Sequence, residues 1–131
     1  MKTTKTKLTI ALLLALVLVM TASVMPAFAG GKTIVVQKFV NADRGGVLRA
    51  AGVTLVIPAK ALPHNAMITM AVDLGAREVT FSPDMDFARP VYVHFAFPVN
   101  GLNYWDGSQW VPVPMFGRTA ILSHFSRYAW W

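Results

Sequence analysis

Serine, histidine and aspartate, the side chains of a hydrolytic triad, all occur in this chain of 131 residues. Such a triad needs its serine on a tight turn, commonly within a Gly-x-Ser-x-Gly motif, and a loop whose N–H groups stabilise the oxyanion. The sequence has neither the motif nor a sign of such a loop, and so short a chain leaves little room for a substrate cleft beside its core. We therefore predict that the protein is not an enzyme.

Two groups of side chains have the chemistry of metal ligands. Asp84 and Asp86 offer two carboxylates in one loop, whereas Ca²⁺ takes about six to eight oxygen ligands. His64, His94 and His124 would suit Zn²⁺, but they lie thirty residues apart, a spacing without a ligand signature. No cysteine is present to add a thiolate or a disulfide. We therefore expect no metal and no other cofactor.

Aromatic residues near a hairpin signal are the first candidate binding residues. Tyr104, Trp105 and Trp110 flank Asp106-Gly107, which would adopt the positive φ angles of a tight turn. Exposed rings would form a platform for a sugar or a partner. Buried rings would be cross-strand pairs that hold the hairpin, and we expect at least Trp110 to be buried.

The tryptophan pair at the C-terminus is the second candidate. Side chains alternate between the two faces of a strand, so Trp130 and Trp131 point to opposite sides. We expect one ring to pack and the other to be exposed, where it would meet a partner or a membrane interface. Trp131 is therefore included among the binding residues.

The first 29 residues read as an export signal. Three lysines precede an apolar run over residues 8–20, and the segment ends in Ala27-Phe28-Ala29. Small residues three and one positions before the cut are the pattern of a cleaved secretory signal, so we predict a signal-peptide helix and cleavage between Ala29 and Gly30. An uncleaved leader that tethers the protein to the membrane is the alternative. We expect the protein to be secreted or at the cell surface.

The charge of residues 30–131 argues against one class of partner. Nine basic residues stand against six acidic ones, and they are spread along the chain without a cluster. Nucleic-acid binding needs a concentrated basic patch, so we expect none. The partner is expected to be an unknown protein or cell-surface ligand, with membrane contact only through an uncleaved leader.

Short strand-like runs separated by turn residues must position these side chains. Alternation of apolar and polar residues predicts strands over residues 33–40, 53–57, 67–73, 78–82, 90–97, 119–122 and 126–131, with a hairpin over 103–110. No segment after residue 29 has a helical period. The sequence predicts one all-β domain over residues 30–131, with two packed antiparallel sheets or a barrel.

Several motifs in this order resemble the ZU-five domain, which occurs in ankyrins, netrin receptors and zonula occludens scaffolds. Residues 52–63 (Gly-Val-Thr-Leu-Val-Ile-Pro-Ala-Lys-Ala-Leu-Pro) are similar to its signature, and residues 87–91, 107–113 and 124–128 to later motifs. The resemblance covers about 80 residues and implies an antiparallel β-sandwich. Lys60 departs from it, because the family more often has glycine there. Standing alone behind an export signal, the domain looks like exported bacterial versions, so the cytoskeletal and apoptotic roles of animal relatives do not carry over.

The resemblance also points to a reaction at His124-Phe125-Ser126. In some members of the family a His-Phe-Ser triplet cuts itself between Phe and Ser. Carried over, His124 would be the general base, Phe125 the acyl donor and Ser126 the nucleophile that attacks the preceding carbonyl. The alternative is an unreactive strand with Phe125 buried and Ser126 hydrogen-bonded. We predict an exported, non-enzymatic binding or structural module, with self-processing between Phe125 and Ser126 as the alternative function.

Overall fold

Alternating apolar and polar residues form two antiparallel sheets in the computed structural model, which describes residues 32–131. The predicted signal-peptide helix and its cleavage residues, Ala27, Ala29 and Gly30, lie outside the described residues. The strands in chain order are β1 (Thr33–Val40), β2 (Gly46–Ala50), β3 (Val53–Ile57), β4 (Ala66–Asp73), β5 (Glu78–Ser82), β6 (Asp86–Phe95), β7 (Leu102–Trp105), β8 (Trp110–Pro112), β9 (Met115–Phe116), β10 (Thr119–His124) and β11 (Arg127–Trp130).

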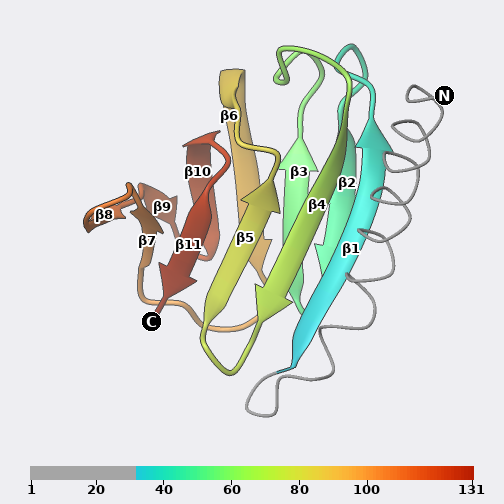
Figure 1. Cartoon of the computed structure of the whole chain (residues 1–131). Helices are drawn as coiled ribbons and strands as arrows, with labels where there is room; N and C mark the ends of the chain where they lie inside the picture. The colour runs from blue at the N-terminus through green and yellow to red at the C-terminus, as the bar shows by residue number, and fades with distance from the viewer. Residues whose placement is uncertain (1–31) are drawn as a thin grey trace, which may run out of the picture.

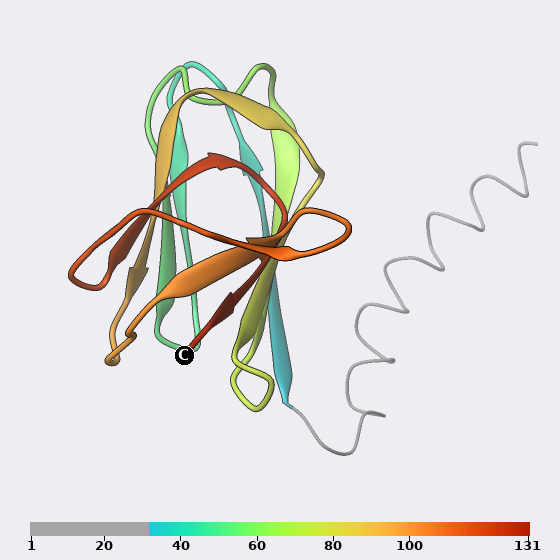
Figure 2. The same ribbon diagram turned by 90° about the vertical axis from the view of Figure 1, so that its left-hand side faces the viewer.

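The strands are distributed over two layers. One sheet has the order β1-β4-β5-β11-β7-β8 and the other β2-β3-β6-β10-β9 (Figure 1). The view turned by 90° shows the two layers facing each other (Figure 2). The chain changes layer between β1 and β2, β3 and β4, β5 and β6, β6 and β7, β8 and β9, and β10 and β11. The predicted all-β fold with two packed antiparallel sheets is confirmed.

The core lies between the sheets, where every second residue of the central strands is buried. In β4 the side chains of Ile68, Met70 and Val72 are fully buried, as the alternation predicts. In β6 the same pattern buries Val91, Val93 and Phe95 from the opposite layer. Phe97, expected on the same face, follows the end of the strand and packs against the core edge. At about 25 cal/mol per Å² of apolar area, this burial is the main stabilising contribution.

The sequence analysis did not predict two of the strands, β2 and β9, for different reasons. β2 pairs with β3 through a two-residue turn, Ala51-Gly52, in which both residues have positive φ angles (51° and 83°). Such a turn favours Asn-Gly or Asp-Gly, so alanine at its first position hides the hairpin. β9 is missed because it has only two residues.

The predicted turn at Asp106-Gly107 is wrong in its geometry. Only Gly107 has a positive φ angle (104°), and Trp105 pairs directly with Trp110, which leaves a four-residue loop. The Asp106 N–H donates to the Gln109 carbonyl at 3.0 Å. The loop therefore contains one left-handed residue, Gly107, instead of the two that the tight turn requires.

Lys60 occupies a position where its residue type conflicts with the backbone. Its φ angle is 65°, in the left-handed region that glycine adopts without steric cost. The Lys60 N–H donates to the Ala42 carbonyl at 2.7 Å, which holds the loop after β3 in this conformation. Glycine would adopt this φ angle without strain, whereas lysine carries the strain.

The beginning of β6 contains an irregularity that places His124. β6 begins at Asp86 rather than at the predicted Pro90. Pairing with β10 is regular up to Val91 and Leu122, and then shifts so that His124 lies opposite Asp86. Proline has no N–H group to donate to a strand ladder. Pro90 lies at this shift, where the regular pairing is interrupted and no backbone donor is needed. The irregularity turns the end of β10 toward the other sheet.

Candidate functional site

A cleft opens in the six-stranded sheet where β11 begins. β11 lies between β5 and β7, and its ladder starts with the pairs of Arg127 with Thr80 and of Tyr128 with Tyr104. Before Arg127 the chain comes from the other sheet, so the last residues of β5, Phe81 and Ser82, extend beyond the β11 ladder. On the other side β7 ends at Trp105, and the hairpin loop follows it. The gap is an open cleft of about 540 Å³, called the hairpin cleft below. Its lining residues are Thr80, Phe81, Asp84, Tyr104, Trp105, Asp106, Gly107, His124, Ser126 and Arg127.

Phe125 anchors the floor of the cleft. Its side chain is buried, stacks on Phe81 with ring centroids 5.3 Å apart, and meets the edge of Phe87 at 4.7 Å. Its N–H donates to the Met85 carbonyl at 3.0 Å. Because Phe125 is fixed in the core, the residues on either side of it, His124 and Ser126, are held at the surface of the cleft.

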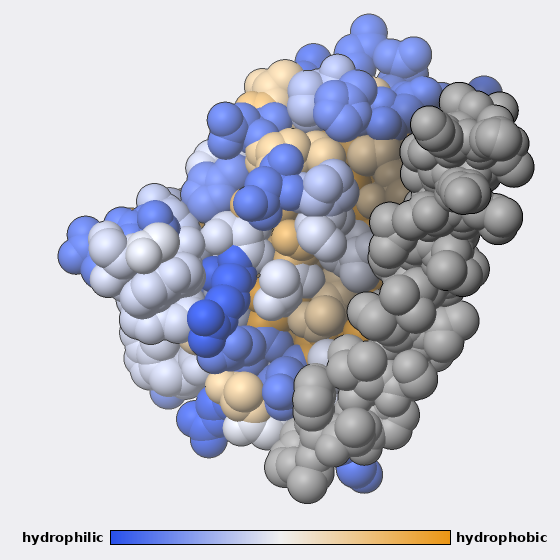
Figure 3. Space-filling model, viewed as in Figure 1, coloured by the Kyte–Doolittle hydropathy of each residue, from blue (hydrophilic) through white to orange (hydrophobic). Residues whose placement is uncertain are grey.

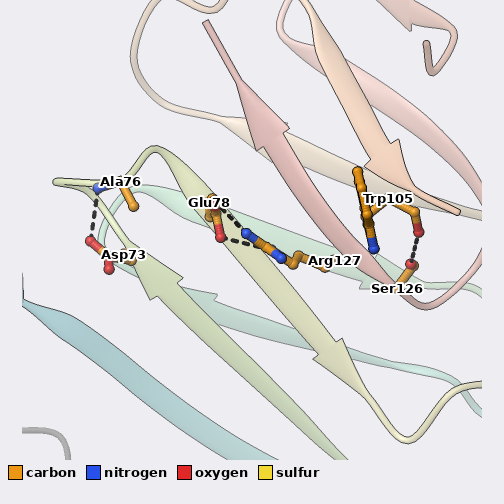
Figure 4. Close-up of polar contacts among 6 residues, drawn as sticks. All are labelled: Asp73, Ala76, Glu78, Trp105, Ser126 and Arg127. Atoms are coloured by element: carbon orange, nitrogen blue, oxygen red, sulfur yellow. Dashed lines mark hydrogen bonds and ion pairs between the residues drawn. The ribbon is translucent and has the colours of Figure 1, made fainter. Parts of the chain in front are cut away.

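Ser126 connects the 124–126 segment to the β7–β8 hairpin through a hydrogen bond. Its hydroxyl donates to the Trp105 carbonyl at 3.1 Å (Figure 4). Its own carbonyl accepts a hydrogen bond from the Phe81 N–H at 3.1 Å. The hydroxyl bond replaces a strand pair that is absent here, since β11 has not yet begun.

His124 contacts the carbonyl that a self-cleavage reaction would attack. Its Nδ1 lies 3.3 Å from the Phe125 carbonyl oxygen. Within residues 32–131, no hydrogen bond joins the His124 ring to the Ser126 hydroxyl. None of residues 124–126 is among those with a positive φ angle. In this arrangement the imidazole is placed to donate to the carbonyl oxygen, not to remove the serine proton.

Tyr128 contacts His124 through its hydroxyl group. The Tyr128 hydroxyl donates to the His124 carbonyl, and the edge of Tyr104 meets the imidazole ring with centroids 4.6 Å apart. Burial, with a smaller contribution from the nearby Tyr104, raises the pKa of Tyr128 well above its usual value. The phenol therefore stays protonated as a donor.

The hairpin wall is built from a tryptophan pair. Trp105 and Trp110 lie opposite each other on β7 and β8, with ring centroids 5.2 Å apart. The cross-strand pairing is as expected, but the predicted burial of Trp110 is wrong, because it remains 37% exposed. β8 is an edge strand of three residues, so no further strand covers the ring.

Arg127 links the wall to the opposite side of the cleft. Its guanidinium makes two hydrogen bonds to the Glu78 carboxylate, of 3.0 and 3.1 Å (Figure 4). The same group lies 5.4 Å from the centroid of the Trp110 ring, within the range of a cation–π contact. The hydrogen bonds to Glu78, with the attraction of its charge, raise the pKa of Arg127 further. The positive charge of Arg127 is thus paired with the carboxylate of Glu78.

Asp106 organises the tip of the hairpin. Its Oδ1 accepts hydrogen bonds from the N–H groups of Ser108 and Gln109, at 2.8 and 2.7 Å, and from the Ser108 hydroxyl. The backbone hydrogen bonds from Ser108 and Gln109 lower the pKa of Asp106. The carboxylate at the rim of the cleft is therefore negatively charged at neutral pH.

The cleft unites two motifs that lie about twenty residues apart in the sequence. Four predicted site residues, Tyr104, Trp105, His124 and Ser126, line it together, and Trp110 stands behind Trp105. Thr80 and Arg127 were not predicted as site residues. Their place in the cleft follows only from the strand register, which pairs Arg127 with Thr80 across 47 residues of the chain.

Trp131 does not belong to the cleft. It follows the opposite end of β11, where its ring lies against Gly101 so closely that a Cβ there would approach it to 2.3 Å. The ring is 51% exposed, whereas Trp130 is buried between Phe95 and Phe97. The expectation that one terminal tryptophan packs and the other is exposed is confirmed.

The candidate metal ligands stay apart. His64 lies in the loop before β4, His94 is hydrogen-bonded to Thr119 on the outer face of β6, and His124 lines the cleft. Asp84 also lines the cleft, while Asp86 opens β6 opposite His124. Over residues 32–131, no three histidine or acidic side chains come together as a metal site.

Comparisons with known proteins give no relatives from which a role could be taken. No protein-family model matches the chain, and no curated protein matches it. In the part of the chain that the structure describes, no helix is both long and apolar enough to span a membrane.

Proposed function

We propose that this protein is an exported, non-enzymatic binding module whose ligand occupies the hairpin cleft. One observation carries the proposal: aromatic, acidic and hydroxyl side chains from β5, β7, the loops that follow these strands and the 124–126 segment converge on one open cleft of about 540 Å³. Small-molecule sites are typically concavities of roughly 300–1,000 Å³ with aromatic walls and a few polar groups. We further propose that the fold is of the ZU-five type, on the motifs given above.

The polar groups of the cleft support binding rather than catalysis. The Ser126 hydroxyl is committed to the Trp105 carbonyl, and Arg127 to Glu78. The imidazole of His124 faces a backbone carbonyl. A nucleophile needs a base within hydrogen-bond reach, and these contacts do not form such a pair. Groups that are held in place by their neighbours form a preorganised surface for a ligand.

Retention on the outer envelope of the producing cell tests the binding function. The exported full-length protein is incubated with washed envelope material, beside the variants Trp105→Ala and Trp131→Ala. We expect the wild type and Trp131→Ala to be retained and Trp105→Ala to be lost, because only Trp105 lines the cleft. Equal retention of all three would contradict a role for the cleft.

The export part of the proposal has its own measurement. The mass of the protein recovered outside the membrane should correspond to a chain that begins at Gly30. A mass that includes residues 1–29 would instead support the membrane-tethered alternative.

Self-processing is the second candidate, and one contact favours it. The Phe125 carbonyl has His124 Nδ1 at 3.3 Å on its oxygen, and Ser126 follows it directly. A donor on this oxygen would stabilise the negative charge that forms when the hydroxyl attacks. The reaction would require the Ser126 hydroxyl to leave the Trp105 carbonyl. The Phe125–Ser126 amide would be exchanged for an ester as the hydroxyl proton passes to the amide nitrogen, and water would then hydrolyse the ester and release residues 126–131.

Denaturing mass spectrometry decides this second candidate. A single species that ends at Trp131 is expected for the binding module. A species that ends at Phe125, together with the six-residue fragment 126–131, would establish self-processing, and Ser126→Ala would then abolish the cut. Ser123→Ala, an exposed serine outside the cleft, is the matched control.

A further inference from the structure

The dimensions of the hairpin cleft limit what it can hold. The cleft lies between β5 and β7, which flank one missing strand, so the two strands are about 10 Å apart. Beyond the Arg127–Thr80 pair, β5 continues only through Phe81 and Ser82, roughly 7 Å, before Pro83. The Phe81 N–H already donates to the Ser126 carbonyl, so an extended peptide would gain at most one backbone pair with β5 in so short a gap. A six-membered ring fits the same length.

The charges around the cleft are unsuited to an anion. The carboxylates of Asp84 and Asp106 both line it, and that of Asp106 has a lowered pKa because of its backbone hydrogen bonds. Arg127, the only lysine or arginine of the lining, is neutralised by Glu78 through two hydrogen bonds. A phosphate, sulfate or uronate would meet two negative charges without a free cation.

The remaining lining suits a ligand with hydroxyl groups on an apolar ring. Trp105 offers a partly exposed indole, Thr80 offers an exposed hydroxyl, and the acidic oxygens are strong hydrogen-bond acceptors. The surface over β7 and β8 is pale to blue, without a large hydrophobic area (Figure 3). A hydrophobic partner would find little apolar surface there. A hydrated ligand with several hydroxyl groups would match both the Trp105 ring and the carboxylate acceptors.

We propose that the hairpin cleft binds a neutral saccharide, an inference that rests on the proposed binding function and names its ligand class. One sugar ring stacks on Trp105, and its hydroxyl groups donate to the carboxylates of Asp84 and Asp106. Arg127 takes no part in charge recognition. Arg127 contacts the Trp110 ring, and Trp110 packs against Trp105, so this contact helps to hold the Trp105 ring in the orientation needed for stacking.

Calorimetric titration of the exported full-length protein tests this ligand class. The probes are tetrasaccharides of neutral hexoses, of N-acetylhexosamines and of uronic acids, with trilysine as a cationic probe. We expect binding of at least one neutral tetrasaccharide and weaker binding of its uronate counterpart. Trp105→Ala should weaken the affinity about tenfold or more, the typical loss of one stacked ring, and Trp131→Ala should leave it unchanged. Thermal unfolding of both variants shows that they are folded.

The outcomes separate this inference from the binding function beneath it. Trilysine binding that exceeds every saccharide and disappears in Asp84→Asn would overturn the saccharide and leave the cleft as a cation site. Uronates that bind more tightly than neutral sugars would also overturn the neutral saccharide, and would leave the cleft as an anion site. Binding of no probe, with Trp105-dependent retention on the envelope, would overturn the saccharide alone. Saccharide binding that survives Trp105→Ala would overturn both proposals.

Discussion

The two ends of β11 close the same sheet in different ways. At the C-terminal end, Trp130 is buried between Phe95 and Phe97, and the layers meet through apolar rings. At the N-terminal end, Ser126 and Arg127 connect neighbouring strands through polar side chains around an open cleft. Apolar packing depends on the removal of water, whereas hydrogen bonds to side chains hold strands together while water remains. The open end is therefore the one that can exchange water for a ligand.

The largest effect is expected at the closed end. Phe95→Ala removes a fully buried ring that contacts both Phe97 and Trp130, so we expect a loss of about 3–5 kcal/mol in the free energy of unfolding. Phe116→Ala is the matched control, because this ring is 70% exposed, and it should change stability by less than about 0.5 kcal/mol. Urea denaturation measures both. Similar losses in the two variants would show that the closed end is not held by apolar packing.

Tyr128 lies between the two ends, and its hydroxyl donates to the carbonyl of His124, a residue that lines the cleft. Tyr128→Phe keeps the buried ring but leaves the His124 carbonyl without its donor, at a cost of about 1–3 kcal/mol. Denaturation at neutral pH measures this loss, and Tyr92→Phe, a half-buried tyrosine on the outer face of β6, is the control. A loss equal to that of Phe95→Ala would remove the distinction between packing and hydrogen bonding.

The same pair of proteins makes a prediction for alkaline pH. Burial raises the pKa of Tyr128 in the folded state, whereas in the unfolded chain it titrates near its ordinary value of about 10. The folded state thus holds the proton more tightly, so this contribution to stability is complete below about pH 10 and is lost as the pH rises above it. The stability advantage of the wild type over Tyr128→Phe should shrink between pH 10 and 11 (approximate bounds that follow from the same pKa). A constant difference over this range would contradict the assignment.

These regions also differ in how far the sequence could predict them. Strands β3, β4 and β6 are recognisable because burial on one face forces an alternation that is visible locally. The cleft depends on register between distant residues, Arg127 with Thr80 and Tyr128 with Tyr104, which no local pattern contains. The candidate residues were therefore recognised by type as separate motifs. Their meeting, and the role of Arg127 between them, follows only from the way the strands pair.

A smaller effect is expected at the open end. Ser126→Ala removes the hydroxyl that donates to the Trp105 carbonyl, and should lower the free energy of unfolding by about 1 kcal/mol. Ser123→Ala, on an exposed residue, should leave it unchanged. Hydrogen exchange would show faster opening at β7 and β8 and no change at β6. A uniform change over all strands would mean that Ser126 supports the whole sandwich rather than the cleft wall.

The smallest effect lies in the loop after β3, away from both ends of β11, and has the opposite sign. Lys60 has a φ angle of 65°, where a Cβ collides with the neighbouring carbonyl and glycine does not. Lys60→Gly should therefore raise the free energy of unfolding by about 0.5–1 kcal/mol, since the relief of strain exceeds the entropy cost of glycine. Lys60→Ala tests the cause, because alanine keeps the Cβ and should gain nothing. If both variants gained equally, removal of the lysine side chain rather than backbone strain would be responsible. Because none of residues 58–65 lines the cleft, ligand affinity should be the same in all three proteins. A change of affinity in Lys60→Gly would mean that the cleft and the rest of the sandwich are coupled.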